Sequence, residues 1–242
     1  MSRKSRRNRP NPERQGPQAD NASQASRRRR GIVIGAVVAV LLAIVVGTLL
    51  FKGDRSQSSP AATTTNQDPL ASAHSPTLGD AGAKVHIVEF IDPACETCAQ
   101  FFPLVKQLMA ENPNRIRLSI RHVAFHDGSD YVVKLLEASR KQDKYLPTME
   151  ALLASQAHWA PHHTVQPDLV LQAIAGVGLN IEQLLVDMNA PEVAQRMEQD
   201  RSDAVALKVT ATPEYFVNGR PMPSFGQQQL LALVSEALQS VY

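Results

Sequence analysis

Cysteine is scarce in this sequence, which contains only Cys95 and Cys98 among 242 residues. An exported domain that relied on disulfides for stability would need bridges between distant segments, because the stabilisation grows with the loop that each bridge closes. A bridge across two intervening residues closes almost no loop. The two cysteines are therefore not a stabilising framework, and we expect their value to lie in their chemistry.

Ligands that would turn the two cysteines into a metal or haem site are also missing. Structural zinc takes four ligands, and none of the seven histidines stands at ribbon or finger spacing. A c-type haem needs a histidine directly after the second cysteine, where this chain has Ala99. We therefore expect no metal and no cofactor. We assign surface or packing roles to the histidines that cluster with Trp159, namely His122, His126, His158, His162 and His163.

Basic residues are concentrated at one end of the chain. Residues 1–30 contain ten basic and two acidic side chains, a net charge of 10 − 2 = +8, so the rest of the chain carries 2 − 8 = −6. Such a tail suits nucleic acid or a membrane surface. A helix-turn-helix pattern and interleaved aromatic and basic residues are both missing, so we expect no nucleic acid partner.

An uncharged apolar segment without proline follows at residues 31–51. As a helix, its 21 residues would span roughly 31 Å, close to the ~30 Å hydrocarbon thickness of a bilayer. The preceding basic residues should keep residues 1–30 in the cytoplasm through the positive-inside bias. We predict a single uncleaved transmembrane helix. The alternative is a cleaved signal peptide, whose apolar region is typically about 7–15 residues behind a short basic lead.

Residues 52–80 are rich in Ser, Pro, Thr, Ala, Gln and Asp. We expect a flexible linker there, because this composition buries too little apolar surface to order itself. The folded domain is predicted over residues 81–242. Within it, β-branched or alternating segments predict strands, and apolar residues at three- and four-residue spacing predict helices. The strands are expected at 84–91, 115–124 and 214–217, and the helices at 95–112, 131–141, 146–156, 167–177, 181–188, 191–207 and 226–241.

The sequence Cys95-Glu96-Thr97-Cys98 lies between the first predicted strand and the helix that follows it. At a helix N-terminus, unpaired N–H groups and the helix dipole favour an anion, so the pKa of the Cys95 thiol should fall. Cys98 stands about one turn later, near enough to attack a mixed disulfide on Cys95. The pattern predicts disulfide exchange with Cys95 as nucleophile and Cys98 as resolving thiol. Glu89 is a third candidate, because an acid in an apolar strand is costly without a role or a partner.

The segment VEFIDPACETCAQFFP, followed more than a hundred residues later by VTATPEYFVNGR, resembles the DsbA/DsbG-type branch of the thioredoxin family. The similarity covers residues 81–242. It implies an α/β thioredoxin fold with a helical insertion at about 127–190. It also implies that Pro213 is a cis proline facing the cysteines, that the Thr212 backbone pairs with an extended substrate segment, and that Glu89 moves protons to and from the resolving thiol.

The two residues between the cysteines depart from this family pattern. Strongly oxidising centres of the DsbA type have Pro-His, whereas this chain has Glu96-Thr97 and lacks that stabiliser of the thiolate. The Glu96 carboxylate should raise the thiol pKa through like-charge repulsion. We therefore expect a less oxidising couple than the roughly −120 mV of DsbA, which favours isomerase or reductase work. A DsbA-like dithiol oxidase and a non-catalytic client-binding module are the alternatives.

The resemblance also implies partners for this domain. Its clients would be extracytoplasmic proteins with thiols or disulfides, and a membrane redox partner would reset the cysteine pair. Together with the predicted anchor, the resemblance places the chain in a bacterial cytoplasmic membrane as a single-pass protein. Its catalytic domain would face the periplasm or the cell exterior.

Overall fold

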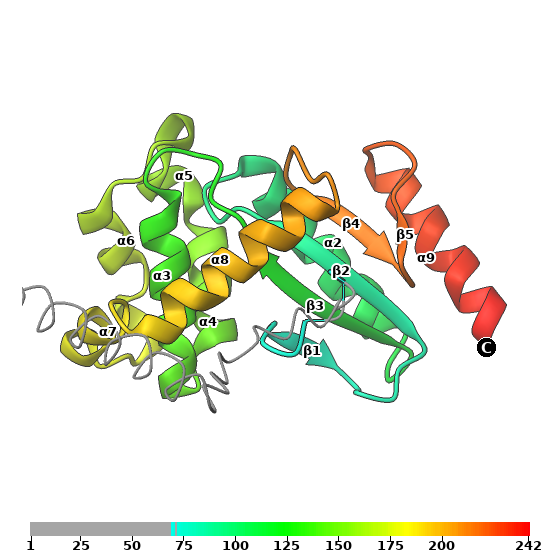
Figure 1. Ribbon diagram of the computed structural model, residues 1–242, viewed down its shortest axis with the longest axis horizontal. Coiled ribbons are helices and arrows are strands. Elements are labelled where there is room, and N and C mark those ends of the chain that lie inside the picture. The colour runs from blue at the N-terminus through cyan, green and yellow to red at the C-terminus, as the bar shows by residue number, and fades with distance from the viewer. Residues whose placement is uncertain (1–68, 71) are drawn as a thin grey trace, which may run out of the picture. The chain divides into compact units, whose positions relative to one another are not determined.

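The computed structural model describes residues 69–70 and 72–242. The predicted basic tail, the predicted transmembrane helix at 31–51 and most of the predicted linker lie outside the described residues. Within the described part of the chain, no helix is both long and apolar enough to cross a membrane. One mixed β-sheet forms the centre of the fold, and a block of helices is inserted between two of its strands (Figure 1).

The sheet of the described residues has five strands in the order β1-β3-β2-β4-β5. Central β2 is parallel to β3 and antiparallel to β4, and the short edge strands β1 and β5 pair antiparallel with β3 and β4. β2 and β3 are buried at nearly every position, and the mostly apolar sequence of β2 is typical of a strand covered on both faces. The strands are β1 (Thr77–Gly79), β2 (Val85–Ile91), β3 (Ile116–His122), β4 (Glu214–Val217) and β5 (Arg220–Pro221).

The helices follow the apolar spacing of the sequence. Helix α2 (Glu96–Glu111) comes directly after β2 and continues through Pro103, and α9 (Gln227–Val241) ends the chain. The helical insertion lies between β3 and β4, as the family resemblance implied. It contains α3 (Ser129–Ser139), η1 (Arg140–Gln142), α4 (Tyr145–Ala154), α5 (Gln156–Trp159), η2 (Pro161–His163), α6 (Pro167–Ala173), η3 (Ala175–Val177) and α7 (Ile181–Asp187), where η denotes a 3-10 helix. Helix α8 (Pro191–Ala206) follows the insertion and leads back to the sheet.

Side chains of β2 alternate between the two faces of the sheet. Ile87 and Ile91 belong to the larger hydrophobic cluster, which also contains side chains of α2 and α9. Val88 and Phe90 belong to a smaller cluster on the opposite face, which α8 covers. In Figure 1, α8 crosses in front of the sheet and α2 lies behind it. By this alternation, Glu89 points to the face that carries α2.

The linker predicted over residues 52–80 ends too late, because strand β1 lies within that range. Residues 77–79 lie inside the range 52–80, yet they pair with β3, where Leu78 stands opposite Leu118. Three residues are too few for a recognisable alternation, so the pairing partner decides that they form a strand. The chain just before β1 is held as well, because His74 Nε2 lies 2.7 Å from Asp200 Oδ1.

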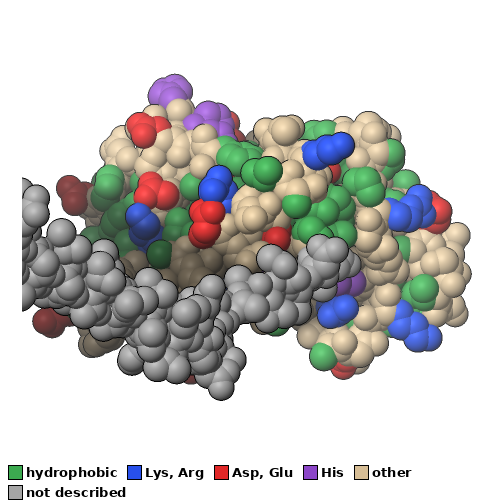
Figure 2. Space-filling model, in the orientation of Figure 1, with side chains coloured by type: hydrophobic (Ala, Val, Ile, Leu, Met, Phe, Trp, Pro, Cys, Tyr) green, Lys and Arg blue, Asp and Glu red, His purple; other side chains and the backbone are tan. Residues whose placement is uncertain are grey.

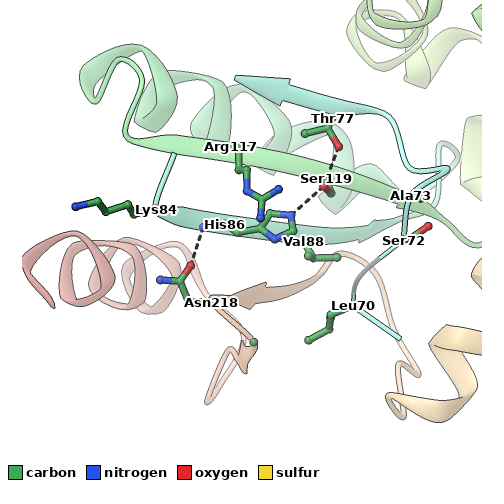
Figure 3. Close-up of a pocket in the computed structure, with 11 residues that line it drawn as sticks. Leu70, Ser72, Ala73, Thr77, Lys84, His86, Val88, Arg117, Ser119 and Asn218 are labelled. Atoms are coloured by element: carbon green, nitrogen blue, oxygen red, sulfur yellow. Dashed lines mark hydrogen bonds between the residues drawn. The ribbon is translucent and has the colours of Figure 1, made fainter. Parts of the chain in front are cut away.

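Helix α8 covers only part of its face of the sheet. Toward the amino end of β2, a hollow of about 630 Å³ opens beside β1. Figure 3 shows His86 and Arg117 lying in this hollow, with His86 Nε2 2.9 Å from Ser119 Oγ. The described residues that line the hollow include no cysteine, no acid and no helical residue. The hollow is therefore separate from the cysteine pair, which lies beyond the carboxyl end of β2.

Candidate active site

The cysteines lie where β2 ends and α2 begins. Asp92 and Pro93 turn the chain, and Cys95 is the N-cap residue of α2 with an extended backbone, φ −81° and ψ 116°. Cys98 follows in the first turn of the helix. Its side chain is fully buried, whereas Cys95 keeps 6% of its surface exposed. Both residues are free thiols. Only Cys95 is therefore open to an incoming sulfur.

The Cys95 sulfur is surrounded by groups that stabilise a negative charge. A hydrogen bond with the Cys98 thiol, working against burial, lowers the pKa of Cys95 to about 5. Hydrogen bonds from the Thr212 side chain and from the backbone N–H groups of Thr97 and Cys98 add to this effect. These N–H groups belong to the unpaired first turn of α2. At neutral pH Cys95 is consequently a thiolate.

The Cys98 sulfur has the opposite environment. Burial raises the pKa of Cys98 far above its ordinary value, and the hydrogen bond to Cys95 and the charges of Cys95 and Glu89 raise it further. Cys98 therefore stays protonated while Cys95 is ionised. The Glu96 side chain is exposed to solvent, which screens its charge. Its predicted tuning of the Cys95 pKa stays a prediction, as does that of the Thr97 side chain.

Glu89 is fully buried on β2, opposite Tyr215 of β4. The Tyr215 hydroxyl donates a hydrogen bond to Glu89 Oε1 at 2.8 Å, and Oε2 has no partner among the described residues. Burial raises the pKa of Glu89 to about 8, against the lowering by Tyr215 and with a further contribution from the charge of Cys95. Glu89 is therefore mostly protonated at neutral pH and close to the point at which it exchanges its proton.

Thr212 and Pro213 are distant from the cysteines in sequence, but the fold brings Thr212 into contact with Cys95. Their peptide bond is cis, as the family resemblance implied. The Cys95 thiol, when protonated, donates to the Thr212 carbonyl oxygen at 3.3 Å across 117 positions of sequence. Pro213 is buried directly before β4. The fold thus brings together Cys95, Cys98, Glu89, Thr212 and Pro213.

Asp92 is a residue of the site that the sequence did not single out. Its buried carboxylate accepts hydrogen bonds from the N–H groups of Ala94, Phe125 and His126 at 2.8, 2.6 and 3.0 Å. It also accepts from His126 Nδ1 at 2.8 Å and from the Ser129 hydroxyl. An aspartate next to a proline after a strand signals a side-chain-supported turn. The partners from residues 125–129 are visible only in the folded chain.

Three aromatic rings in contact lead from Glu89 to solvent. The Phe101 ring on α2 stacks with that of Tyr215, their centroids 6.1 Å apart, and lies 4.9 Å from that of Phe225. Phe225 is 55% exposed. Phe101 lies in the helix predicted at 95–112, and Phe225 stands just before the helix predicted at 226–241. Of these three rings, Phe225 is therefore the one that presents apolar surface to solvent.

The clustered histidines occupy three environments. His122 is buried and lies 2.7 Å from a tyrosine hydroxyl, which confirms a packing role. His158 and His162 are exposed. His126 and His163 are partly buried and contact the turn that carries the cysteines. Within the part of the chain that the structure describes, no group of three or more His, Cys, Asp or Glu side chains could hold a metal ion.

Comparisons with known folds agree with this arrangement. A profile of the family described as Thioredoxin matches residues 71–236. A thioredoxin-like oxidoreductase from Silicibacter pomeroyi aligns with a TM-score of 0.63 and 30% identity, over 73% of this chain and 99% of that one. Alpha-DsbA1 from Wolbachia pipientis shares the fold, with a TM-score of 0.60 and 19% identity over 72% of this chain and 97% of its own.

Relatives found by sequence differ in how much of their length is matched. The Na(+)/H(+) antiporter NhaA of Herminiimonas arsenicoxydans is 26% identical over 86% of this chain, but the match covers 33% of that protein. "Probable disulfide bond formation protein D" of Bacillus anthracis is 22% identical over 78% of this chain and 88% of its own length. This chain therefore spans about a third of the antiporter and most of the second relative.

Proposed function

Because this chain belongs to the thioredoxin family, we propose that it is a thiol–disulfide oxidoreductase that acts through Cys95 and Cys98. The observation that carries the proposal is the opposite shift of two thiol pKa values within one helical turn. The pKa of Cys95 is lowered to about 5, and that of Cys98 is raised. A thiolate is the form that attacks a disulfide, while a protonated neighbour waits until the mixed disulfide has formed.

In the reducing direction, the Cys95 thiolate attacks one sulfur of a client disulfide, and the other client sulfur leaves as a thiolate. Cys98 then gives up its proton and attacks Cys95, which releases the first client sulfur. The client gains two electrons, and the cysteine pair becomes a disulfide. Ionised Glu89 accepts the Cys98 proton, and protonated Glu89 returns it when the reaction runs backwards. A pKa of about 8 suits both roles near neutral pH.

The client segment is proposed to bind in extended form along Thr212. The Thr212 carbonyl lies 3.3 Å from Cys95 Sγ, so a strand paired with this backbone would bring its own sulfur to Cys95. Pro213 lacks an N–H group, which leaves this edge free of a competing donor. Phe225 offers exposed apolar surface for neighbouring client side chains.

The direction of exchange depends on how strongly the protein stabilises the reduced pair. A Cys95 pKa of about 5 lies between the ~7 of thioredoxin and the ~3.5 of DsbA. We therefore propose a reduction potential between about −270 and −120 mV, which suits isomerase or reductase work better than strong dithiol oxidation. A measured value near −120 mV would favour the DsbA-like oxidase instead.

The domain is proposed to work outside the cytoplasm on a membrane anchor. Residues 1–30 would form the cytoplasmic tail, residues 31–51 the transmembrane helix and the residues after them a linker to the thioredoxin-like domain. The basic tail next to an uncharged apolar segment supports this order. Clients would be extracytoplasmic protein thiols or disulfides, and a membrane redox partner would reset the pair. The relative named for disulfide bond formation supports this choice of clients.

Trapping of mixed disulfides tests the proposed function. Cys98→Ser removes the resolving thiol, so client proteins should accumulate on Cys95 as adducts that a reductant releases. Cys95→Ser is the matched control and should trap none. If Cys98→Ser traps no protein, the proposal that the protein exchanges disulfides with protein clients is wrong. Client binding that survives replacement of both cysteines would support the non-catalytic binding module.

A further inference from the structure

The helical insertion contacts the active-site turn through the short segment α5–η2. Gln156 Nε2 donates to the carbonyl oxygens of Pro93 at 2.7 Å and Cys95 at 2.8 Å. His163 Nδ1 lies 3.2 Å from the carbonyl oxygen between them, that of Ala94. Three successive carbonyl groups, ending with that of the nucleophile, thus accept from two side chains. We call Gln156 and His163 the carbonyl clamp.

A second imidazole completes a ring of contacts around the turn. The rings of His163 and His126 stack with centroids 4.6 Å apart at an angle of 23°. His126 Nδ1 lies 2.8 Å from Asp92 Oδ2. Because carbonyl and carboxylate oxygens only accept, both Nδ1 atoms carry the proton. This series of contacts, Asp92 to His126 to His163 to the Ala94 carbonyl, therefore starts and ends on the turn that holds Cys95.

The backbone of the clamp is itself held in an uncommon conformation. His162 and His163 both have positive φ, 52° and 60°, a region that few non-glycine residues adopt. Buried Trp159 anchors the preceding helix by donating from Nε1 to the Leu152 carbonyl at 2.8 Å. The surrounding contacts therefore fix where the His163 ring lies, as expected of a residue with a positional role.

The clamp lies at an exposed end of the insertion. Figure 2 shows histidine side chains at the surface there, while His163 itself is partly buried against the turn. By holding the carbonyl groups up to that of Cys95, the clamp fixes the start of α2. The N–H groups of this first turn stabilise the Cys95 thiolate and hence the reduced pair.

We propose that Gln156 and His163 are positioning residues that hold the active-site turn and thereby tune the redox couple of Cys95 and Cys98. The insertion would thereby supply an imidazole that Glu96-Thr97 does not. This inference rests on the proposed function, since it concerns the same cysteine pair. It assigns the insertion a part in the chemistry as well as in the fold.

Two variants of His163 separate its hydrogen bond from its ring. His163→Gln keeps an N–H donor, and His163→Phe keeps an aromatic ring without the donor. The measurement is the equilibrium of the purified full-length protein with glutathione at neutral pH. The thiolate absorbance of Cys95 is followed in parallel. Exposed His158→Phe is the matched control.

We expect His163→Phe to shift the equilibrium toward the oxidised pair by ~3- to 10-fold, because a hydrogen bond to the turn is lost. His163→Gln should match the wild type. Gln156→Met should raise the Cys95 pKa, and the His163 variants decide the matter if the Gln156→Met protein does not fold. Equal equilibria for wild type and His163→Phe would overturn the inference, as would the same shift in His158→Phe.

Failure of the proposed function would look different. The glutathione equilibrium requires no protein client, so it can be measured even if Cys98→Ser traps none. A His163-dependent shift without trapped clients would leave the inference standing and reject the client-directed activity. Trapped clients without such a shift would support the client-directed activity and reject the inference.

Discussion

Glu89 and Asp200 are both buried carboxyl groups, on opposite faces of one sheet, but their surroundings differ. Asp200 on α8 accepts hydrogen bonds from Arg121 Nε at 2.5 Å, from His74 Nε2 at 2.7 Å and from the His122 N–H group at 2.9 Å. Glu89 on β2 accepts one from a tyrosine hydroxyl at 2.8 Å, and its second oxygen has no partner among the described residues.

The two carboxyl groups consequently have opposite pKa shifts. Burial acts to raise both values. For Asp200, the hydrogen bond from His74, the charge of Arg121 and the His122 N–H group outweigh burial, and the pKa falls below 3.8. For Glu89, burial prevails and the pKa rises to about 8. A fully paired carboxylate stabilises the fold, whereas one short of partners keeps a proton available for chemistry.

The same shifts give opposite effects of pH on stability. The stabilisation from Asp200 is present above its ordinary pKa of 3.8 and is lost as pH falls through the lowered value. Glu89 favours the folded state fully only below 4.5, and this contribution is lost as pH rises through about 8. Variants of the two sites should therefore change the pH profile of unfolding in opposite senses.

We expect the largest loss of stability from a variant that removes the arginine partner of Asp200. Arg121→Met removes a guanidinium that also bonds Asp203 Oδ2 at 2.5 Å, and leaves the buried Asp200 carboxylate without its arginine. The free energy of unfolding at neutral pH should fall by about 3–5 kcal/mol, as measured by urea denaturation. Lys106→Met breaks the exposed pair with Glu150 and should cause no measurable loss. A similarly small loss for Arg121→Met would contradict a stabilising role for this network.

Glu89→Gln should slow disulfide exchange more than it changes the stability of the fold. The resolving step should slow by about 100-fold, because the group that exchanges the Cys98 proton is lost. Rapid quenching of a preformed mixed disulfide measures that step. The wild type should also lose roughly 3 kcal/mol between pH 4.5 and neutral pH from this group, and the variant should lack that loss. An unchanged resolving rate would remove Glu89 from the proton path.

Tyr215→Phe should have the smallest effect of the three. The hydroxyl bond to Glu89 lowers the pKa of that carboxyl, so its loss should raise the pKa further and move the rate profile to higher pH. The free energy of unfolding should fall by about 1 kcal/mol. The pH dependence of mixed-disulfide resolution is the measurement. A shift to lower pH would show that the hydroxyl does not stabilise ionised Glu89.

Much of this domain could be predicted from its sequence, because local patterns and burial agree along most of it. Strand 214–217 was predicted without error, and α2 within one residue at each end. The segment 167–177 divides into α6 and η3. β1 could not be predicted, since a three-residue edge strand depends on its partner.

The sequence by itself determined that two cysteines stand one turn apart at the start of a helix, with an acid in the strand before them. Helix geometry and the unpaired first-turn N–H groups follow from that local order. Only the tertiary structure decided what surrounds these groups. It buried Cys98 beside Glu89, brought Thr212 to within 3.3 Å of Cys95, and set Gln156 and His163 on the turn. Burial and through-space contact shift pKa values, and neither can be read from neighbours in the chain.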